Sequence, residues 1–215
     1  MLHHALRAKG VTSGGGGSPT LEYVTHAKIT SGSTITIPAS AQAGDIAVIQ
    51  NRATAVAGSP TNVVPANFTE VIHMLSSNNA TRVRTSYKKL VSGDPGSSVG
   101  VNYAAFTTGA ICWIFRPSTA IASLSVASLN KVMTDSDPGS QTVASQTAPY
   151  LVLGDCGSSA TPSFNSTWYD TTDIAGYVRG GYVIVNSSPG SYSIDMNDLG
   201  SRNHLISFAL VPTFA

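Results

Sequence analysis

Apolar and polar residues alternate along the chain from residue 21 onward, with the period of two that is typical of β-strands. This pattern predicts strands at 21–29, 33–37, 68–75, 82–91, 99–103 and 110–115. Residues 46–50 form a nearly continuous apolar run, as in a strand buried on both faces. Turn residues recur at intervals of about 8 to 12 residues, and no segment has a convincing helical pattern. The sequence therefore predicts an all-β protein, an antiparallel β-sandwich with a jelly-roll-like arrangement.

The second half of the chain repeats several features of the first half. The run at 46–50 matches 150–154, Tyr87 matches Tyr182, and 111–115 matches 206–210. We expect pseudo-repeat halves at about 40–117 and 145–212 within one sandwich, because about five strands alone would bury too small a core. The alternative is that a chain rich in Gly, Pro and Ser produces such matches by accident.

Residues 1–20 differ in composition from the rest of the chain. A short stretch with scattered apolar residues is followed by the glycine run 14–17, which is typical of a flexible tether. We expect residues 1–20 to form an N-terminal anchoring arm and residues 21–215 to form the sandwich domain. The arm residues expected to contact neighbouring subunits are Leu2, His3, His4, Leu6, Arg7, Lys9 and Val11.

Charge and composition exclude several classes of function. The chain has 215 residues, of which 11% are charged, and its formal net charge is +1. About a quarter of its residues are Ser or Thr, so short neutral hydroxyls are expected to cover the surface. Without a basic field, nucleic acid is not an expected partner. The sequence has neither an apolar run long enough for a membrane span nor the pattern of a secretory signal peptide, so we expect no membrane span and no Sec export.

The motifs of common enzymes are missing from the sequence. It has no Gly-x-Ser-x-Gly, His-Glu-x-x-His or Cys-x-x-Cys motif, and its glycine run lacks the ending that cradles phosphates. We therefore expect no enzymatic activity, no cofactor and no metal. His26 and His73 lie in alternating segments and are expected to be hydrogen-bonded residues on a strand face. His3 and His4 alone make an incomplete metal site.

Two acidic or basic clusters each allow two interpretations. The segment from Asp135 to Gly139 resembles a fragment of a calcium loop, but it lacks the terminal Glu, and a β-turn explains it better. Residues Arg82, Arg84 and Lys88 share one face of a strand. This basic stripe either meets phosphates or an acidic neighbour, or keeps an exposed or edge strand soluble.

Two further features concern cysteines and aromatic residues. Cys112 and Cys156 lie in apolar segments, where buried free thiols are commoner than a disulfide.

Trp168, Tyr169, Asp170 and Asp173 combine aromatic rings with carboxylates in a segment rich in Ser and Asn. Such a combination can bind a glycan, since a ring packs on the sugar and a carboxylate accepts its hydroxyl hydrogen bonds. A cluster that caps the core is the alternative.

Several degenerate motifs follow one another in an order that resembles a known family. They are Gly44-Asp45 before an apolar strand, Pro65-Ala66-Asn67-Phe68-Thr69 before the next, and the segment from Arg84 through Asp94-Pro95-Gly96-Ser97. This order resembles a family of β-sandwich proteins found in tailed bacteriophages. The start of the chain, 1–8 and 14–19, also resembles the starts of phage structural proteins. The match covers residues 1 to about 117, and Phe68 stands where relatives often have Trp.

The resemblance implies a structural component of the virion, as a head decoration protein or a neck or tail accessory protein. Its implied partners are capsid, neck or tail subunits together with further copies of itself. Its implied location is the virion, after synthesis in the cytoplasm of the host bacterium. A carbohydrate-binding or host-receptor-binding module of a tail fibre or spike is the alternative, in which case a host surface glycan is the partner.

Overall fold

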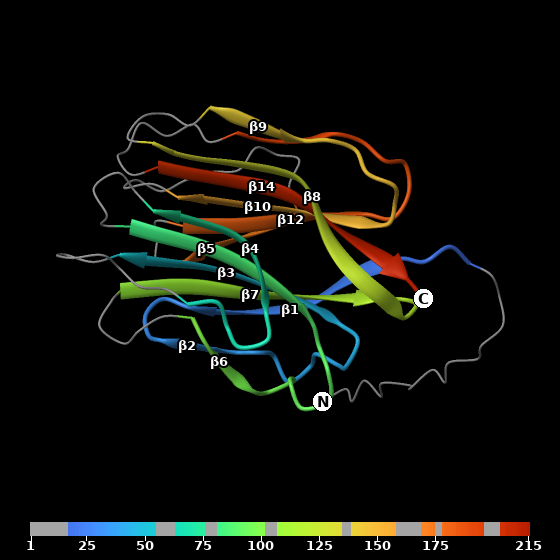
Figure 1. The fold of residues 1–215 in the computed structure, drawn as a ribbon, viewed down its shortest axis with the longest axis horizontal. Helices are drawn as coiled ribbons and strands as arrows, with labels where there is room; N and C mark the ends of the chain where they lie inside the picture. Colours follow the sequence, from blue (N-terminus) through green and yellow to red (C-terminus); the bar gives the residue numbers. More distant parts are fainter. Residues whose placement is uncertain are drawn as a thin grey trace, which may run out of the picture.

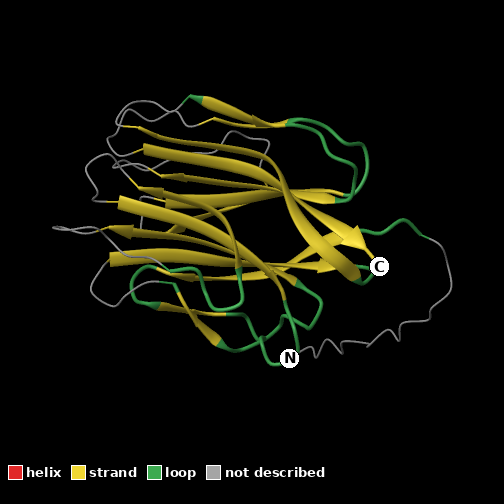
Figure 2. Cartoon of the chain, viewed as in Figure 1, coloured by secondary structure: helices red, strands yellow, loops and turns green. Residues whose placement is uncertain are grey.

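The computed structural model describes residues 17–54, 63–75, 81–101, 107–134, 139–157, 169–174, 178–195 and 203–215. In this part the chain consists of antiparallel strands joined by turns and loops, and contains no helix (Figure 2). The first half of the chain contains β1 (Leu21–Ile29), β2 (Thr34–Thr36), β3 (Ile46–Thr54), β4 (Thr69–Leu75), β5 (Thr81–Lys89), β6 (Ser98–Gly100) and β7 (Thr107–Pro117). The second half contains β8 (Ile121–Thr134), β9 (Ser140–Val143), β10 (Tyr150–Gly157), β11 (Tyr169–Ile174), β12 (Val178–Val185), β13 (Tyr192–Asp195) and β14 (Asn203–Phe214).

These strands form four layers (Figure 1). The first sheet has the order β1-β7-β3-β5-β4, and the second sheet has the order β11-β12-β10-β14-β8. The two sheets face each other, so the predicted β-sandwich architecture is confirmed. The pair β2-β6 covers the outer face of the first sheet, and the pair β9-β13 covers the outer face of the second.

Each space between layers contains its own hydrophobic core because side chains alternate across a strand. In β3, Ile46 and Val48 point between the two sheets, whereas Ala47 and Ile49 pack under β2-β6. Tyr150, in β10, belongs to the third core, under β9-β13. The near-continuous apolar run at 46–50 is explained by this arrangement, since both faces of β3 are buried.

Aromatic rings fill the centre of the core between the sheets. Tyr23 stacks on Tyr182 of the opposite sheet, with ring centroids 5.1 Å apart. Trp113 and Phe115 meet the same Tyr182 ring edge-on, at 5.4 and 5.1 Å. Edge-to-face and offset-stacked rings are favoured over face-to-face pairs, and each adds to the energy of burial. Trp113 and Phe115 thus belong to the core, as their apolar run predicts.

One glutamine crosses from the first sheet to the second. Gln50, in β3, is completely buried. Its side-chain Nε2 donates to the Gly154 carbonyl at 3.0 Å, and its Oε1 accepts from Trp113 Nε1 at 2.8 Å. This side chain lies so close to β12 that a Cβ atom placed on Gly180 would stand 2.5 Å from Gln50 Oε1. Position 180 therefore requires glycine because there is no room for a side chain, and not because of its backbone conformation.

The two halves of the chain have the same strand order. If each strand of the first half is matched with the strand seven positions later, the order β1-β7-β3-β5-β4 becomes β8-β14-β10-β12-β11, which is the second sheet read backwards. The small pairs correspond as well, since β2-β6 becomes β9-β13. Within each half the pairing is nested, first strand with last and second with second-last.

The longest strand, β8, is absent from the sequence-based predictions. Its residues are mostly small, and a bulge interrupts the alternation where Ser128 adopts a φ of 49° between two stretches paired with β14. The extra residue shifts the pattern of inward and outward side chains by one position. The alternation of apolar and polar residues therefore does not predict β8, a strand that is stabilised mainly by its pairing with β14.

We predict that Gly180→Ala destabilises the fold by about 1–3 kcal/mol, because the added methyl group forces Gln50, Ile111 and Trp113 to move. Gly190→Ala is the matched control, since a Cβ atom at that position meets nothing within 4 Å. Urea denaturation measures both changes. Equal stability of the two variants would contradict the tight contact between the sheets.

Candidate functional site

Most of the site residues proposed from the sequence lie outside the described residues. This holds for Leu2, His3, His4, Leu6, Arg7, Lys9, Val11 and Trp168. Tyr169, Asp170 and Asp173 lie on β11, the edge strand of the second sheet, where the backbone is described but the side chains are not. A bulge between Tyr169 and Thr171 leaves Asp170 opposite no residue of β12. The proposed glycan site therefore stays a prediction.

The point at which the N-terminal segment joins the sandwich is held by both sheets. The Leu21 amide donates to Asn186 Oδ1 at 2.7 Å, and Asn186 Nδ2 donates to the Leu21 carbonyl at 2.8 Å. The Thr20 amide donates to Ser118 Oγ at 2.9 Å, and the Ser118 amide donates to the Thr20 carbonyl at 2.8 Å. Asn186 follows β12 of the second sheet, and Ser118 follows β7 of the first. We call this set of contacts the mount.

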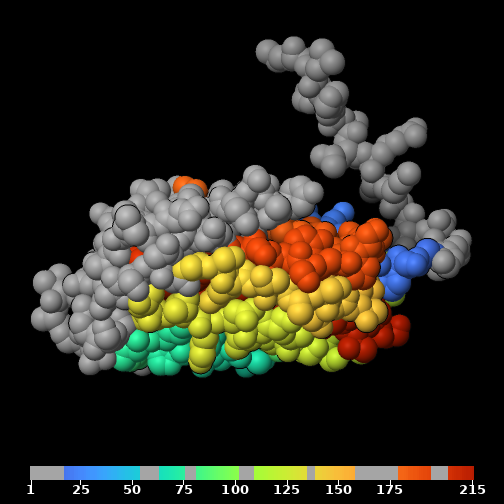
Figure 3. Space-filling model, turned by 90° about the horizontal axis from the view of Figure 1, so that it is seen from above, coloured from blue at the N-terminus to red at the C-terminus, as the bar shows by residue number. Residues whose placement is uncertain are grey.

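The mount lies at one end of the sandwich, which we call the mount end. The blue residues that precede and begin β1 lie at this end in Figures 1 and 3, and the last residues of β14 lie there too. The opposite end is marked by Thr54, which pairs with Thr81 and Thr107, and by Asn203, which pairs with Thr134. The strands thus run lengthwise between two distinct ends.

Polar residues replace apolar ones on the inner faces of the strands toward the opposite end. Along β3 the inward positions change from Ile46 and Val48 to Gln50 and Arg52. Along β10 they change from Leu151 and Leu153 to Asp155. Polar side chains of β3 and β10 thus enter the interior toward the opposite end, where Val83 and Met74 of the neighbouring strands remain apolar.

The opposite end contains a buried acid–base pair. His204 Nε2 lies 3.2 Å from Asp155 Oδ1, and neither residue has any exposed surface. Asp155 is in β10, and His204 is the second residue of the adjacent β14, two residue pairs further along the ladder and on the same face. The remaining polar atoms, Asp155 Oδ2 and His204 Nδ1, have no hydrogen-bond partner among the described residues. A carboxylate that orients an imidazole is also the geometry of proton-transfer sites, but such a site requires access for a substrate.

Sequence reasoning missed this pair. The signal is present, because Asp155 and His204 both occupy inward positions in otherwise apolar strands. These two positions can be recognised as a pair only once it is known that β10 lies beside β14 in the sheet.

Two of the three cations of the basic stripe are paired with carboxylates of the same chain. Arg84 Nε lies 3.1 Å from Glu70 Oε2, and Lys88 Nζ lies 2.7 Å from Asp94 Oδ1. The predicted division of the strand is confirmed, since Val83 and Thr85 are fully buried on its other face. The interpretation as an edge strand is wrong, because β5 lies between β3 and β4. The acidic neighbours are residues of the same chain.

The two histidines predicted on strand faces have different environments. His26 Nδ1 is 2.7 Å from the Tyr23 hydroxyl, so the predicted hydrogen bond is confirmed. The pKa of His73 is lowered by partial burial and then by the positive charges of Arg84 and Arg82, against an opposing effect of Glu70. His73 is therefore neutral at physiological pH, when its neighbours carry their positive charge.

Both cysteines are buried thiols that are not joined in a disulfide, as predicted. Burial raises the pKa of Cys112 to about 12, so its thiol stays protonated and unreactive in the folded protein.

Within the described ranges, no three His, Cys, Asp or Glu residues come together as metal ligands. Of the calcium-loop fragment, Asp135 and Asp137 lie outside these ranges, and Gly139 has the positive φ of 69° that suits a turn. No helix long and apolar enough to cross a membrane occurs in the part of the chain that is described.

Comparison of the chain with protein-family models, with curated proteins and with solved structures finds no match.

We predict strong coupling between Asp155 and His204. Asp155→Leu or His204→Leu alone leaves one buried polar group without its partner and costs about 3–5 kcal/mol. The double variant costs much less than the sum, because both polar groups are removed together. Urea denaturation of the four proteins at pH 7 gives the coupling energy. Additive losses would show that the two side chains do not interact.

We predict that Asp94 contributes to stability at neutral pH and loses this contribution in acid. Partial burial acts to raise the pKa of Asp94, but hydrogen bonds from Lys88 and the Val91 amide, together with the Lys88 charge, lower it overall. A lowered pKa in the folded state stabilises above the unfolded value of about 3.9 and is lost as the pH falls through the folded value. Asp94→Asn should therefore lower stability at pH 7 and lose less stability on acidification.

Unfolding by urea between about pH 7 and pH 2 measures this effect. Glu22→Gln is the control, because the exposed Glu22 carboxylate forms no ion pair in the described ranges and acts on Arg116 only as a more distant charge, after Asp45. Parallel pH profiles for wild type and Asp94→Asn would contradict the prediction.

Proposed function

We propose that the protein is a structural component of a tailed-phage virion, a β-sandwich displayed on the particle and anchored to neighbouring subunits by its N-terminal arm. The observation that carries the proposal is the mount. Four hydrogen bonds fix the residues that follow the arm to both sheets at one end of the sandwich. Because the arm leaves the domain at the mount end, the opposite end of the sandwich lies farther from the attachment.

The order of the motifs, which resembles that in phage β-sandwich proteins, is a second line of support for the proposal. The residues of these motifs hold the fold of the first half. Gly44 turns the chain with a φ of 95°, and the Asp45 carboxylate, nearly fully buried, forms a two-pronged ion pair with Arg116 at 2.8 and 2.9 Å. Asn67 has a φ of 64° and directs Phe68 into the core under β2-β6.

The low surface charge suits a protein packed beside many copies of itself. The edge strand β8 exposes Ala122, Ser123, Ser125 and Leu129, and its single charged residue is Lys131. Neutral short side chains can approach an identical surface without repulsion between like charges. A homo-oligomeric arrangement on the particle is part of the proposal.

We also infer that the chain consists of two copies of one seven-stranded unit. The matching strand order of the two sheets supports this, as does the nested pairing within each half, which is that of a rolled-up hairpin as in a jelly roll. The units then correspond to 21–117 and 121–214, wider than the repeat visible in the sequence. They share the core between the sheets, so they make one domain.

Deletion of residues 2–18 tests the anchoring. The truncated protein should fold, because the mount begins at Thr20 and β1 at Leu21, but it should no longer be incorporated into particles. Sedimentation of particles assembled with either form, followed by quantitative immunoblotting, measures the incorporated fraction.

Two variants of the full chain make the test specific. Replacing Leu2, Leu6 and Val11 together by Ser should abolish incorporation, since these side chains are proposed to fill pockets of neighbouring subunits. Replacing the glycines at 14–17 by Ser should leave it intact, since the tether keeps its length and flexibility. Normal incorporation of the truncated protein would refute the anchoring role.

A further inference from the structure

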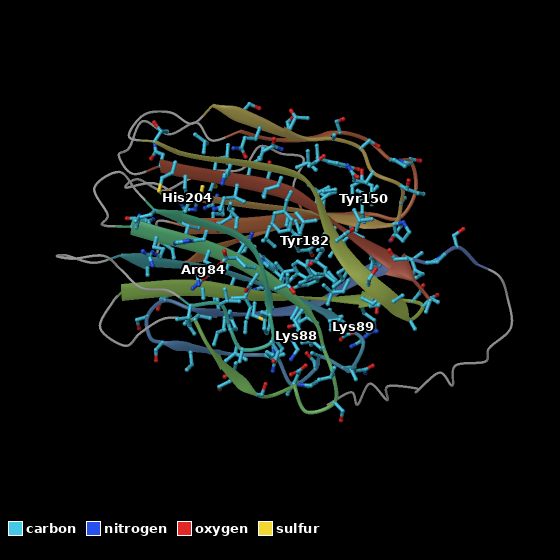
Figure 4. All side chains as sticks on the ribbon, viewed as in Figure 1. Arg84, Lys88, Lys89, Tyr150, Tyr182 and His204 are labelled. Atoms are coloured by element: carbon cyan, nitrogen blue, oxygen red, sulfur yellow. The ribbon has the colours of Figure 1, made fainter. Side chains whose placement is uncertain are left out.

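A hollow opens between the two sheets, close to the mount end, where the edge of the first sheet meets β8. It has a volume of about 290 Å³ and is lined by Asn67, Thr69, Tyr87, Lys89, Ser123 and Leu124, among others. This volume is near the lower limit for ligand pockets, so the hollow accommodates a small molecule or a single unit of a polymer. Figure 4 labels Lys88 and Lys89, which lie at the end of β5 and line the hollow together with residues of β8.

The two lysines at the hollow differ in their charge balance. Lys88 is paired with Asp94 at 2.7 Å, and its Nζ also lies 5.8 Å from the centre of the Phe68 ring. Lys89 Nζ instead donates to the Ile121 carbonyl and forms no ion pair in the described part of the chain. The carbonyl orients the ammonium group but does not neutralise it. Lys89 is exposed, so it gives the rim of the hollow one positive charge that an anionic group can balance.

Three polar side chains around the hollow have hydrogen-bonding capacity to spare. Asn67, Thr69 and Ser123 make no side-chain hydrogen bond with any described residue. Thr69 pairs with Tyr87 across β4 and β5, and the exposed Ser123 of β8 lines the same hollow, so these polar groups come from both sheets. An amide and two hydroxyls can donate and accept, which suits a ligand that carries several hydroxyl groups.

The remaining wall of the hollow is apolar and aromatic. The Tyr87 ring is held by a long hydrogen bond of 3.4 Å from its hydroxyl to the Leu124 carbonyl, and the Leu124 side chain lines the hollow beside it. A half-buried ring next to uncommitted polar groups packs well on the flat face of a sugar.

We propose that this hollow binds an acidic saccharide unit, with its carboxylate on Lys89, its hydroxyls on Asn67, Thr69 and Ser123, and its ring against Tyr87. The proposal is independent of the anchoring role of the arm, since none of its residues belongs to the mount. It also differs from the glycan site predicted at Trp168 and Tyr169.

Titration of the ¹⁵N-labelled full chain with D-glucuronate, followed by NMR, tests the proposal. Saturable shifts of the amide signals of Lys89 and Ser123 are expected. D-Glucuronamide, which lacks the charge, and D-glucose should each bind at least about tenfold more weakly, because a hydrogen bond to a charged partner is lost. Acetate and inorganic phosphate, which lack the sugar ring, should also bind at least about tenfold more weakly.

Variants locate the binding at the hollow. Lys89→Met should weaken glucuronate binding by about tenfold and Lys89→Arg should restore most of it, because Arg keeps the charge and can still donate to the Ile121 carbonyl. Asn67→Gly removes the amide without straining the positive φ and should weaken glucuronate and glucuronamide alike. Lys28→Met is the matched control, since Lys28 is an exposed strand lysine of β1 that does not line the hollow.

The outcomes separate clearly. The proposal is supported if glucuronate binds more tightly than each of the four other probes. This preference should be lost in Lys89→Met and kept in Lys28→Met. Equal affinity for glucuronate and glucuronamide, equal affinity for acetate or phosphate, unchanged affinity in folded Lys89→Met, or no saturable shift would each overturn it. The ¹⁵N spectrum of each variant reports whether it is folded.

Discussion

The contact between the two large sheets depends on the buried side chain of Gln50. A glutamine placed in an apolar core is costly unless all its polar atoms are satisfied. Here the indole of Trp113 and the backbone carbonyl of Gly154 satisfy it, and one of these partners belongs to each sheet. Glycine at position 180 allows the close approach that these bonds require. Purely apolar side chains could slide past one another, whereas this polar contact fixes the relative position of the sheets.

Much of the fold follows from the sequence, and the reasons are local. The alternation of apolar and polar residues in 21–29 predicts β1 directly. The turn at 92–97 is stabilised by residues close in sequence, as in the hydrogen bond from the Val91 amide to Asp94. The strand β8 and the pair Asp155–His204 do not follow, because their significance depends on a strand far away in the sequence. The arm and the segment around Trp168 are recognisable in sequence by composition alone, and composition does not determine a geometry.

The residues of the motifs that resemble those of phage proteins form ion pairs that stabilise the first half of the fold. Asp45 and Arg116 tie the beginning of β3 to the end of β7, and Lys88 with Asp94 ties β5 to the turn that follows it. Lys88 also lines the hollow, and Asn67 belongs to both the motif and the hollow. A motif that specifies a fold can therefore also determine the shape of a nearby surface, without any residue being kept for binding alone.

The mount has a mechanical consequence. A pulling force applied through the N-terminal segment enters the domain at Leu21, along the axis of β1. Because the hydrogen bonds between antiparallel strands lie across the strand axis, such a force loads the whole β1–β7 ladder in shear instead of opening it one bond at a time. The two bonds to Asn186 transfer part of the load to the second sheet. The domain is thus arranged to bear tension that is applied through its N-terminal segment along β1.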